Sequence, residues 1–281
     1  MGVRQWKIRD SAIDLSRRGL IMGVLNVTPD SFSDGGRFFD PETAVAHGVQ
    51  MTKEGAQIID VGGESSRPGA ESIPVAEEQR RVLPVIEQLR HQTDSFISID
   101  TCKAEVARAA LDAGASVVND ISGGRADPEM LPLVARRKAA LIIMHMQGTP
   151  KTMQAAPNYT DVVDEVANFF RQQYGRALEC GIDPMAIAFD PGIGFGKTLE
   201  HNLELLGNLG RLRVEDRPIV IGISRKSFLE KLAKAPGEAD RLIPTVAFTA
   251  LLRSRGAEVF RVHDVAENLQ ALRVAEAIMA R

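Results

Sequence analysis

The chain has 281 residues, of which 44% are hydrophobic and 25% charged, an ordinary composition for a globular protein. The formal net charge of −3 excludes a global attraction to nucleic acid or anionic membrane, so any anion site must be local. Two cysteines cannot form a disulfide scaffold, and no apolar run approaches the roughly 20 residues of a membrane span. The N-terminus also lacks the hydrophobic core of a secretion signal, so we expect a cytoplasmic protein.

Eight short apolar runs, separated by segments of helical character, recur along the chain. They are Leu20–Leu25, Gln57–Val61, Phe96–Ile99, Ser116–Asn119, Ala140–Met144, Ala186–Phe189, Pro218–Ile223 and Glu258–Val262. Continuous rather than alternating apolar runs predict strands buried on both faces, as in parallel sheets. Amphipathic stretches at 75–91, 103–113 and 162–180 predict helices between them. This α/β alternation favours a (β/α)8 TIM barrel spanning 1–281 as one domain, with a doubly wound sheet as the alternative.

The connections are unequal in length. Gly- and Pro-rich segments follow the strands at 26–40, 62–74, 145–160 and 191–201, whereas the returns from helix to strand are shorter. This asymmetry is expected when a site is built from the loops at the C-terminal ends of barrel strands. Before the first barrel strand, Trp6–Ile8 and Ile13–Leu15 flank a polar turn and predict a small β-hairpin over the bottom of the barrel.

A polar residue stands at the end of every predicted strand. In chain order these residues are Asn26, Asp60 with Glu64, Asp100, Asn119 with Asp120, His145, Asp190, Ser224 with Arg225 and Lys226, and Arg261 with His263. One such residue would be interpreted as a helix cap. Eight together predict a pocket with carboxylates and amides on one side and cations on the other.

These groups suit two features of a ligand. Asp190, Asp100 and Asn119 can exchange hydrogen bonds with the edge of a nitrogen heterocycle. Arg261 and His263, with Arg67, suit phosphate, since the loop after the last strand is a recurrent phosphate site in barrels. Asn26 offers an oxygen to Mg²⁺, which needs few protein ligands when a substrate phosphate is present. The absence of HExxH and CxxC motifs argues against a zinc site.

Ordered motifs add a family resemblance. They are Gly23–Gly36, Asp60–Gly69, Ser98–Lys103, Val118–Gly123, Met144–Pro150, Phe189–Lys197, Gly222–Ser227 and Arg261–His263. From about Ile21 to its C-terminus the chain resembles the bacterial dihydropteroate synthases of the pterin-binding family. It departs from the family pattern at Ser66, where the family usually has Thr, and Cys102 occupies a variable position.

The resemblance implies a transferase of folate biosynthesis that joins 7,8-dihydropterin-6-ylmethyl diphosphate to 4-aminobenzoate. Its products are 7,8-dihydropteroate and diphosphate, and the expected chemistry is dissociative. The implied contacts to the pterin diphosphate are Ser66, Asp100, Asn119, Asp190, Lys226, Arg261 and His263, of which Asp100, Lys226, Arg261 and His263 take catalytic roles. Those implied for 4-aminobenzoate are Phe32, Arg67, Pro68, Phe195, Lys226 and Ser227.

The resemblance also implies Mg²⁺ at Asn26, competition by sulfonamides, and closure of the loops 32–36 and 65–69 over the site. Two alternatives stay open. A corrinoid methyltransferase that uses methyltetrahydrofolate would not need the anion motif 261–263 or the loop 65–69, and both are present. A non-catalytic paralogue would lack a catalytic position, and none is missing.

The last predicted helix is apolar over more than one stripe. Its apolar residues are Val265, Ala266, Leu269, Leu272, Ala275, Ile278 and Met279, and Glu267, Gln270, Arg273 and Glu276 leave a narrow polar seam. A barrel covers only one face of an outer helix, so the second apolar face predicts a homodimer, unless neighbouring helices cover it.

Overall fold

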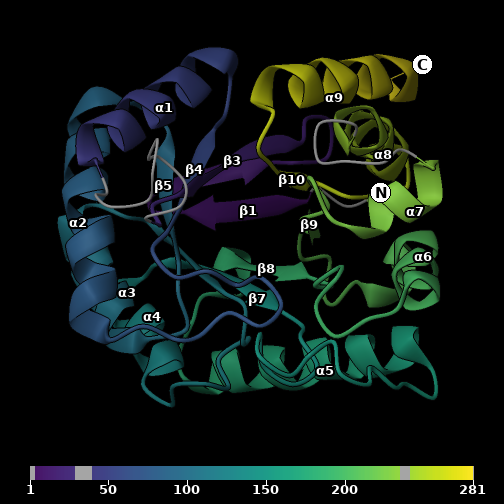
Figure 1. Cartoon of the computed structure of the whole chain (residues 1–281), viewed down its shortest axis with the longest axis horizontal. Coiled ribbons are helices and arrows are strands. Elements are labelled where there is room, and N and C mark those ends of the chain that lie inside the picture. Colours follow the sequence, from purple (N-terminus) through teal and green to yellow (C-terminus); the bar gives the residue numbers. More distant parts are fainter. Residues whose placement is uncertain (1–3, 29–39, 235–240, 281) are drawn as a thin grey trace.

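The computed structural model describes residues 4–28, 40–234 and 241–280, and its centre is an eight-stranded parallel sheet. The strand order is β8-β7-β6-β5-β4-β3-β10-β9. A parallel bridge between Phe189 and Ile219 joins the two edges of the sheet, so it closes into a barrel. Figure 1 shows the helices surrounding this sheet, with α1 and α2 on the left, α8 and α9 at the upper right, and α5 below. The predicted (β/α)8 barrel is confirmed.

The barrel strands coincide with the eight apolar runs. They are β3 (Leu20–Asn26), β4 (Ile58–Gly62), β5 (Phe96–Asp100), β6 (Val117–Asp120), β7 (Ala140–Met144), β8 (Ile187–Asp190), β9 (Val220–Ile221) and β10 (Val259–Val262). The largest difference is β9, which covers only two of the six residues predicted at 218–223. Pro218 has no N–H to donate to a ladder, and after Ile221 the chain leaves the sheet for the polar segment 224–226.

Helices separate the strands, and the three amphipathic stretches match their predicted bounds within one residue. The α-helices are α1 (Pro41–Glu54), α2 (Val75–Gln92), α3 (Ala104–Ala113), α4 (Met130–Arg137), α5 (Val162–Glu179), α6 (Leu199–Gly207), α7 (Phe228–Ala233), α8 (Leu242–Ser254) and α9 (Val265–Met279). Short 3-10 helices lie at η1 (Pro184–Ala186) and η2 (Leu209–Leu212). Asp40 caps α1 and Asp161 caps α5 by accepting hydrogen bonds from their first backbone amides.

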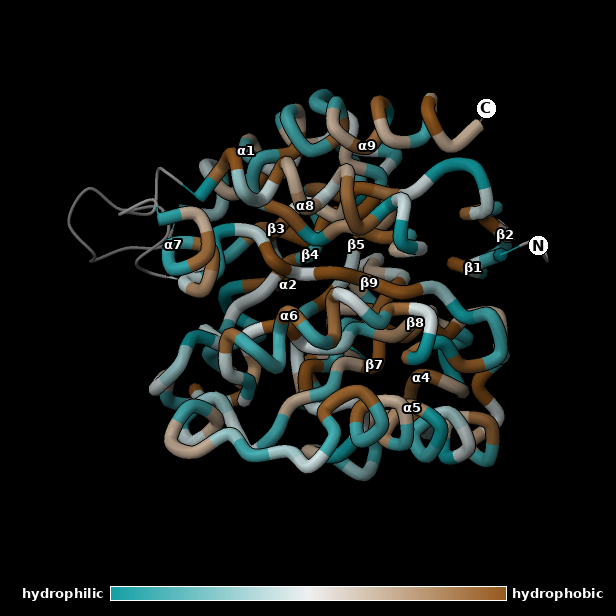
Figure 2. Tube along the Cα trace, turned by 90° about the vertical axis from the view of Figure 1, so that its right-hand side faces the viewer, coloured by the Kyte–Doolittle hydropathy of each residue, from teal (hydrophilic) through white to brown (hydrophobic). Residues whose placement is uncertain are grey.

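Alternate residues of each strand enter two different cores. Ile21 and Leu141 point outward into the layer between strands and helices, whereas Met22 and Ile142 point into the barrel. This double burial explains the continuous apolar runs. In Figure 2 the brown strands are enclosed by helices whose colour alternates between teal and brown.

The N-terminal hairpin covers the bottom of the barrel, as predicted. It consists of β1 (Gln5–Ile8) paired antiparallel with β2 (Ser11–Asp14). Trp6 is fully buried among the inward residues of the strands, and its indole Nε1 donates to the carbonyl of Ala186 at 3.0 Å. Figure 1 shows β1 crossing the middle of the barrel.

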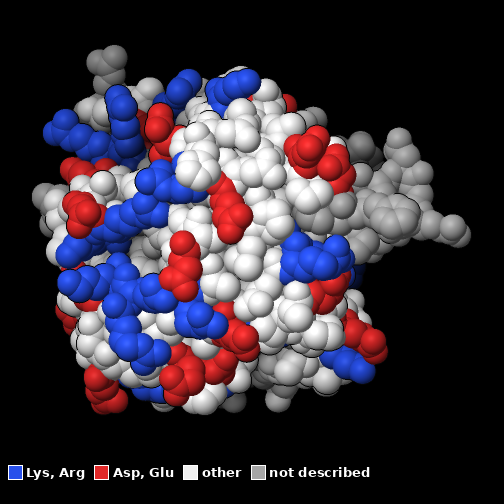
Figure 3. All heavy atoms as spheres, turned by 90° about the vertical axis from the view of Figure 1, so that its left-hand side faces the viewer, with Lys and Arg blue, Asp and Glu red and all other residues white. Residues whose placement is uncertain are grey.

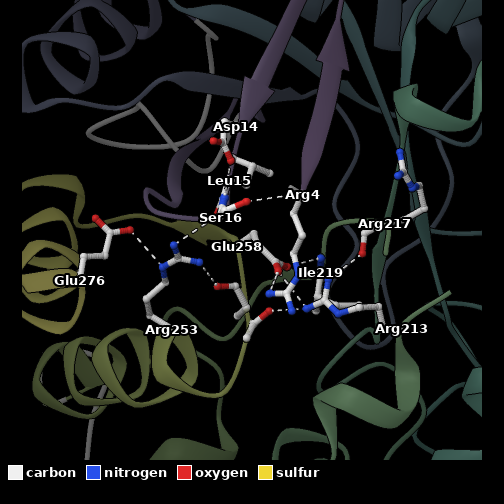
Figure 4. A network of polar contacts seen from close by, with 12 residues as sticks. Arg4, Asp14, Leu15, Ser16, Arg213, Arg217, Ile219, Arg253, Glu258 and Glu276 are labelled. Atoms are coloured by element: carbon white, nitrogen blue, oxygen red, sulfur yellow. Dashed lines mark hydrogen bonds and ion pairs between the residues drawn. The ribbon is translucent and has the colours of Figure 1, made fainter. Parts of the chain in front are cut away.

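A polar network lies at the same end of the barrel (Figure 4). The buried carboxylate of Glu258 accepts from Arg4 Nη1 at 2.8 Å, Arg213 Nη2 at 2.9 Å and the Ile219 amide at 2.8 Å. Arg253 is 1% exposed and donates to Leu15 and Ala257 carbonyls and to Glu276. Each of these buried charges is therefore matched by several partners.

The outer surface mixes both signs of charge. Figure 3 shows basic and acidic side chains interspersed on the face that includes α2. The ion pair between Arg81 and Glu77, at 2.7 Å, lies within α2. The pair between Arg137 and Asp112, at 2.6 Å, joins α4 to α3. Among the described helices, none is both long and apolar enough to cross a membrane.

Candidate active site

One pocket lies at the C-terminal ends of the barrel strands, where the long loops gather. It is lined by Ser66, Asp100, Asn119, Ile121, Met144, Asp190, Gly192, Ile193, Phe195, Gly222, Lys226 and Arg261. Strands β5, β6, β7, β8 and β10 each place one of these side chains with their last residues. Seven of the residues predicted for substrate therefore line one pocket, namely Ser66, Asp100, Asn119, Asp190, Phe195, Lys226 and Arg261.

Arg261 ties two carboxylates together in this pocket. Its Nε donates to Asp60 at 2.6 Å and its Nη2 donates to Asp100 at 2.8 Å. Asn119 Nδ2 donates to the same Asp60 oxygen at 3.1 Å. The other Asp60 oxygen, Oδ1, is buried and has no hydrogen-bond partner among the described residues. The cations and carboxylates are thus interleaved, instead of occupying opposite sides as predicted.

Burial dominates the electrostatics of this cluster. It raises the pKa of Asp100 to about 7, although the Arg261 guanidinium acts in the opposite direction. Burial works to lower the pKa of Arg261, but Asp60 and Asp100 outweigh it, so the pKa of that guanidinium lies above its usual range. Asp100 therefore changes its protonation near neutral pH while Arg261 stays charged.

Asp190 has one oxygen engaged and one available. Its Oδ1 accepts from the Gly192 amide at 2.7 Å, which fixes the turn after β8. No hydrogen bond from a described residue reaches Oδ2, which lies 3.7 Å from the position that a Cβ on Gly222 would take. Burial raises the pKa of this carboxyl, with the Gly192 hydrogen bond and Lys226 opposing. Asp190 thus caps a loop and also offers an acceptor to the pocket.

Lys226 lies across the pocket against an aromatic ring. Its ammonium sits 3.9 Å from the centroid of the Phe195 ring, a cation–π contact. Burial, together with the nearby Arg261 charge, lowers the pKa of Lys226 to about 8, although Asp190 acts in the opposite direction. Lys226 is therefore mainly cationic at pH 7 and loses its charge as the pH rises through about 8.

Five of the predicted contacts do not line this pocket. Arg67, Pro68 and Ser227 are exposed, and Asn26 and His263 lie outside the lining residues. Phe32, with the loop 32–36, lies outside the described residues. His263 Nδ1 meets Ser224 Oγ at 3.0 Å, and burial lowers the pKa of that imidazole to about 3, so it is neutral.

Other polar residues at the strand ends stabilise loops. Asp120 accepts from the amides of Ser122 and Gly124, both at 2.8 Å. Glu64 accepts from Lys103 at 2.6 Å and from the Ile73 amide at 2.7 Å. Asp120 therefore caps the turn after β6 and not a helix, since the next helix, α4, begins only at Met130.

Lys197, near the pocket, was not predicted as a site residue, and His145 was predicted only as one of the polar residues at the strand ends. Lys197 is 3% exposed and its Nζ lies 3.1 Å from Nδ1 of His145, which is 8% exposed. His145 also lines a second, surface cavity of about 370 Å³ beside α5. A signal for Lys197 was present, because it follows the alternating glycines of the motif 189–197.

Comparisons with known proteins agree with this geometry. The family model "Pterin binding enzyme" matches residues 22–263. A dihydropteroate synthase of Synechocystis sp. is 45% identical over 96% of this chain and 94% of its own. A structure of Xanthomonas albilineans dihydropteroate synthase with 4-aminobenzoic acid has a TM-score of 0.92, 43% identity and full coverage of both chains. A Yersinia pestis dihydropteroate synthase with a sulfonamide drug has a TM-score of 0.92 and 40% identity, covering 99% of this chain and 100% of its own.

These three relatives bear the name of the synthase and not that of a corrinoid methyltransferase, and their coverage extends over both barrel ends. The predicted family is therefore confirmed. This chain belongs to the pterin binding enzyme family and, within it, to the dihydropteroate synthases.

Proposed function

We propose that this chain joins 7,8-dihydropterin-6-ylmethyl diphosphate to 4-aminobenzoate, releasing diphosphate and 7,8-dihydropteroate. The observation that carries the proposal is the convergence of Asp100, Asn119, Asp190, Lys226 and Arg261 in one pocket at the strand ends. This set presents heterocycle-binding acceptors and anion-binding cations to the same space. The 4-aminobenzoic acid and the sulfonamide named for the two solved relatives support 4-aminobenzoate as one substrate, and the family description supports a pterin as the other.

The pterin edge is held by Asp190 and Asn119. The Asp190 Oδ2, on which no described residue places a hydrogen bond, accepts from the amino and ring N–H groups of the heterocycle. Met144 and Ile121 line the same pocket and give the flat ring an apolar wall. Because Asp190 ends β8 and is fixed by Gly192, the pterin anchor is rigid.

The diphosphate meets the cations. Two nitrogens of Arg261 are engaged by Asp60 and Asp100, so the guanidinium presents its remaining Nη1 to the phosphate. His263, two residues after Arg261, adds a neutral imidazole to this proposed phosphate site.

Asn26 fits a divalent cation that accompanies the diphosphate. Its Oδ1 and Asp100 Oδ2 lie 3.9 Å and 3.8 Å from the same point, the position of a Cβ on Gly62. No group of three or more His, Cys, Asp or Glu side chains among the described residues could hold a metal alone. Few protein oxygens plus substrate phosphates are the usual environment of Mg²⁺. Bound Mg²⁺ would supply charge neutralisation that makes diphosphate a better leaving group.

The residues favour a dissociative reaction. The bond between the exocyclic carbon and the diphosphate oxygen breaks, and the electron-rich dihydropterin stabilises the cation. The neutral amine of 4-aminobenzoate then forms the C–N bond and loses one proton. No nucleophile–base pair is needed, so positioning and electrostatics provide the rate enhancement. Phe195 and Lys226 frame 4-aminobenzoate, with Arg67, Pro68 and Ser227 approaching from exposed loops.

We further propose a cytoplasmic homodimer, each subunit one barrel domain over 1–281. Both cysteines are free, as suits a reducing compartment. Ile243 of α8 is 79% exposed, and Val274 and Ile278 of α9 are 61% and 71% exposed, so the paired helices keep an apolar outer face. Glu276, predicted in a polar seam, instead accepts from Arg253 at 3.0 Å. A monomer mass by light scattering at micromolar concentration would exclude the dimer.

The catalytic proposal is tested by measuring diphosphate release with both substrates and Mg²⁺, and with each component omitted. We expect release only when the pterin diphosphate, 4-aminobenzoate and Mg²⁺ are all present, and 7,8-dihydropteroate in equal amount. Absence of release in the complete mixture, with folded protein, would contradict the proposal.

A further inference from the structure

The backbone of the loop after β8 lies so close to the backbone of the loop after β7 that its glycine positions have no room for a side chain. Gly192, Gly194 and Gly196 have φ angles of 65°, 81° and 66°, in the left-handed region that favours glycine. A Cβ on Gly192 would lie 1.9 Å from the His145 carbonyl oxygen, and one on Gly196 would lie 2.7 Å from that of Gln147. The loop therefore packs backbone on backbone, and its glycines provide no side chains to hold it.

Instead, the side chains of three other residues donate hydrogen bonds to the backbone carbonyl groups of this loop. Gln154 Nε2 donates to Gly194 at 2.7 Å, Lys197 Nζ to Phe195 at 3.0 Å, and the Tyr159 hydroxyl to Gly196 at 2.8 Å. Gln154 is exposed and Tyr159 half-buried, whereas Lys197 is buried. The bond to Phe195 is thus the one shielded from water.

The same ammonium binds the opposite backbone. Lys197 Nζ lies 3.3 Å from the His145 carbonyl and 3.1 Å from His145 Nδ1. Burial lowers the pKa of His145 to about 2, with Lys197 adding to that effect, so the imidazole is neutral and accepts at Nδ1. Lys197 thereby joins the loop after β7 to the loop after β8.

This arrangement is costly for stability. All three acceptors are neutral, and no described carboxylate lies within ion-pair distance of Lys197. Burial lowers the pKa of this lysine to about 7. Asp190 opposes this shift from beyond ion-pair distance, but a buried cation with no directly paired carboxylate is disfavoured relative to an apolar side chain of similar size. Such a group beside a substrate pocket points to a function in the site.

We propose that Lys197 is a positioning residue for the 4-aminobenzoate half of the pocket: by pinning the Phe195 carbonyl to His145, it holds the Phe195 ring against Lys226. The inference rests on the proposed function. Asp190 is less dependent on this pin, since β8 pairs with β7 and Gly192 donates to its carboxylate. Removal of the pin should therefore affect one substrate more than the other.

The test compares Lys197→Met with Tyr159→Phe, which removes a bond to the adjacent carbonyl of the same loop. For Lys197→Met we expect the KM for 4-aminobenzoate to rise about tenfold or more, as suits a lost charged hydrogen bond. The KM for the pterin diphosphate should change less than about threefold. Tyr159→Phe should change both constants less than about threefold, because its lost bond is a neutral one.

A second variant separates positioning from folding. Lys197→Gln keeps a donor that can reach the Phe195 carbonyl, so it should recover part of the lost 4-aminobenzoate KM. Equal changes in both KM values, or failure of both variants to fold, would overturn the proposal in favour of a structural role. Unchanged KM values in folded Lys197→Met would overturn it by showing that Lys197 does not position Phe195.

The pKa of His145, measured by NMR, gives a readout that needs no activity. In folded Lys197→Met it should rise from its very low value towards the ordinary value of about 6.5, because a neighbouring cation is removed. An unchanged His145 would show that Lys197 is not its partner. An inactive wild-type protein in which His145 responds as expected would count against the proposed function alone.

Discussion

The two ends of the barrel contain similar charged residues but use them differently. At the N-terminal end of the strands, Glu258 and Arg253 are buried with three partners each (Figure 4). At the C-terminal end, one oxygen of Asp60 has no hydrogen-bond partner in the described part of the chain, and the pKa values of Asp100 and Lys226 are displaced towards neutrality. Charged groups whose hydrogen bonds are all made within the protein stabilise the fold, whereas groups that lack partners remain available to bind a ligand.

The largest effect on stability is expected at the N-terminal end of the barrel strands. Arg253→Ala leaves Glu276 and the carbonyls of Leu15 and Ala257 without their donor. Breaking such a buried pair costs about 3–5 kcal/mol of the free energy of unfolding. Urea denaturation measures this loss. A cost near zero would show that the network is not a stabilising element.

The next effect is on binding, at the C-terminal end. Asp190→Asn replaces one acceptor oxygen with a donor, which mismatches the pterin edge. We expect a loss of about 1.5–3 kcal/mol, or roughly 10- to 150-fold in pterin diphosphate affinity. Calorimetric titration checks it. Unchanged affinity in a protein of lower stability would mean that Asp190 only caps the loop through Gly192.

A smaller effect is expected from pH. Because the pKa of Lys226 is lowered to about 8, its ammonium is present below that pH and is lost above it. Loss of the ammonium removes the cation–π contact that holds the Phe195 ring, a contact worth about 0.5–2 kcal/mol. Because Phe195 frames 4-aminobenzoate, affinity for that substrate should fall between pH 7 and 9.5 by up to the corresponding factor of roughly 2 to 30. Lys226→Arg stays charged and should remove the decline. A wild-type affinity that is flat over this range would refute the assignment.

The smallest effect concerns Arg4. Its Nη1 donates to Glu258, but Arg213 and the Ile219 amide continue to bind that carboxylate in Arg4→Ala. We expect a loss of about 0.5–1.5 kcal/mol in the free energy of unfolding and no change in either KM. Denaturation and steady-state kinetics on the same preparation provide both values. A change in KM would show that the two ends are coupled.

Much of the fold could be predicted from local patterns. The eight apolar runs identify the strands because burial on both faces leaves a continuous signal. Residues at the strand ends are predictable for the same reason, since the carboxyl ends of parallel strands meet at one edge. β9 was overestimated because an apolar run does not reveal where the chain leaves the ladder.

Side-chain pairing could not be predicted in this way. Arg261 and Asp60 are 201 residues apart in sequence and meet only through the closure of the barrel. Lys197 and His145 belong to adjacent loops whose approach depends on the left-handed glycines. The exposure of Arg67 and Ser227 likewise depends on loop conformation, which no periodicity reports.

Substrate binding therefore depends on the C-terminal end of the barrel strands, and stability depends on the charge network at the opposite end. The most direct test of this difference measures diphosphate release at limiting pterin diphosphate, together with Tm, for Asp190→Asn and Arg4→Ala. We expect Asp190→Asn to lose most of its diphosphate release at an unchanged Tm, and Arg4→Ala to keep its release but to unfold at a lower temperature. The opposite pattern, with release lost in Arg4→Ala and only Tm lost in Asp190→Asn, would contradict this expectation.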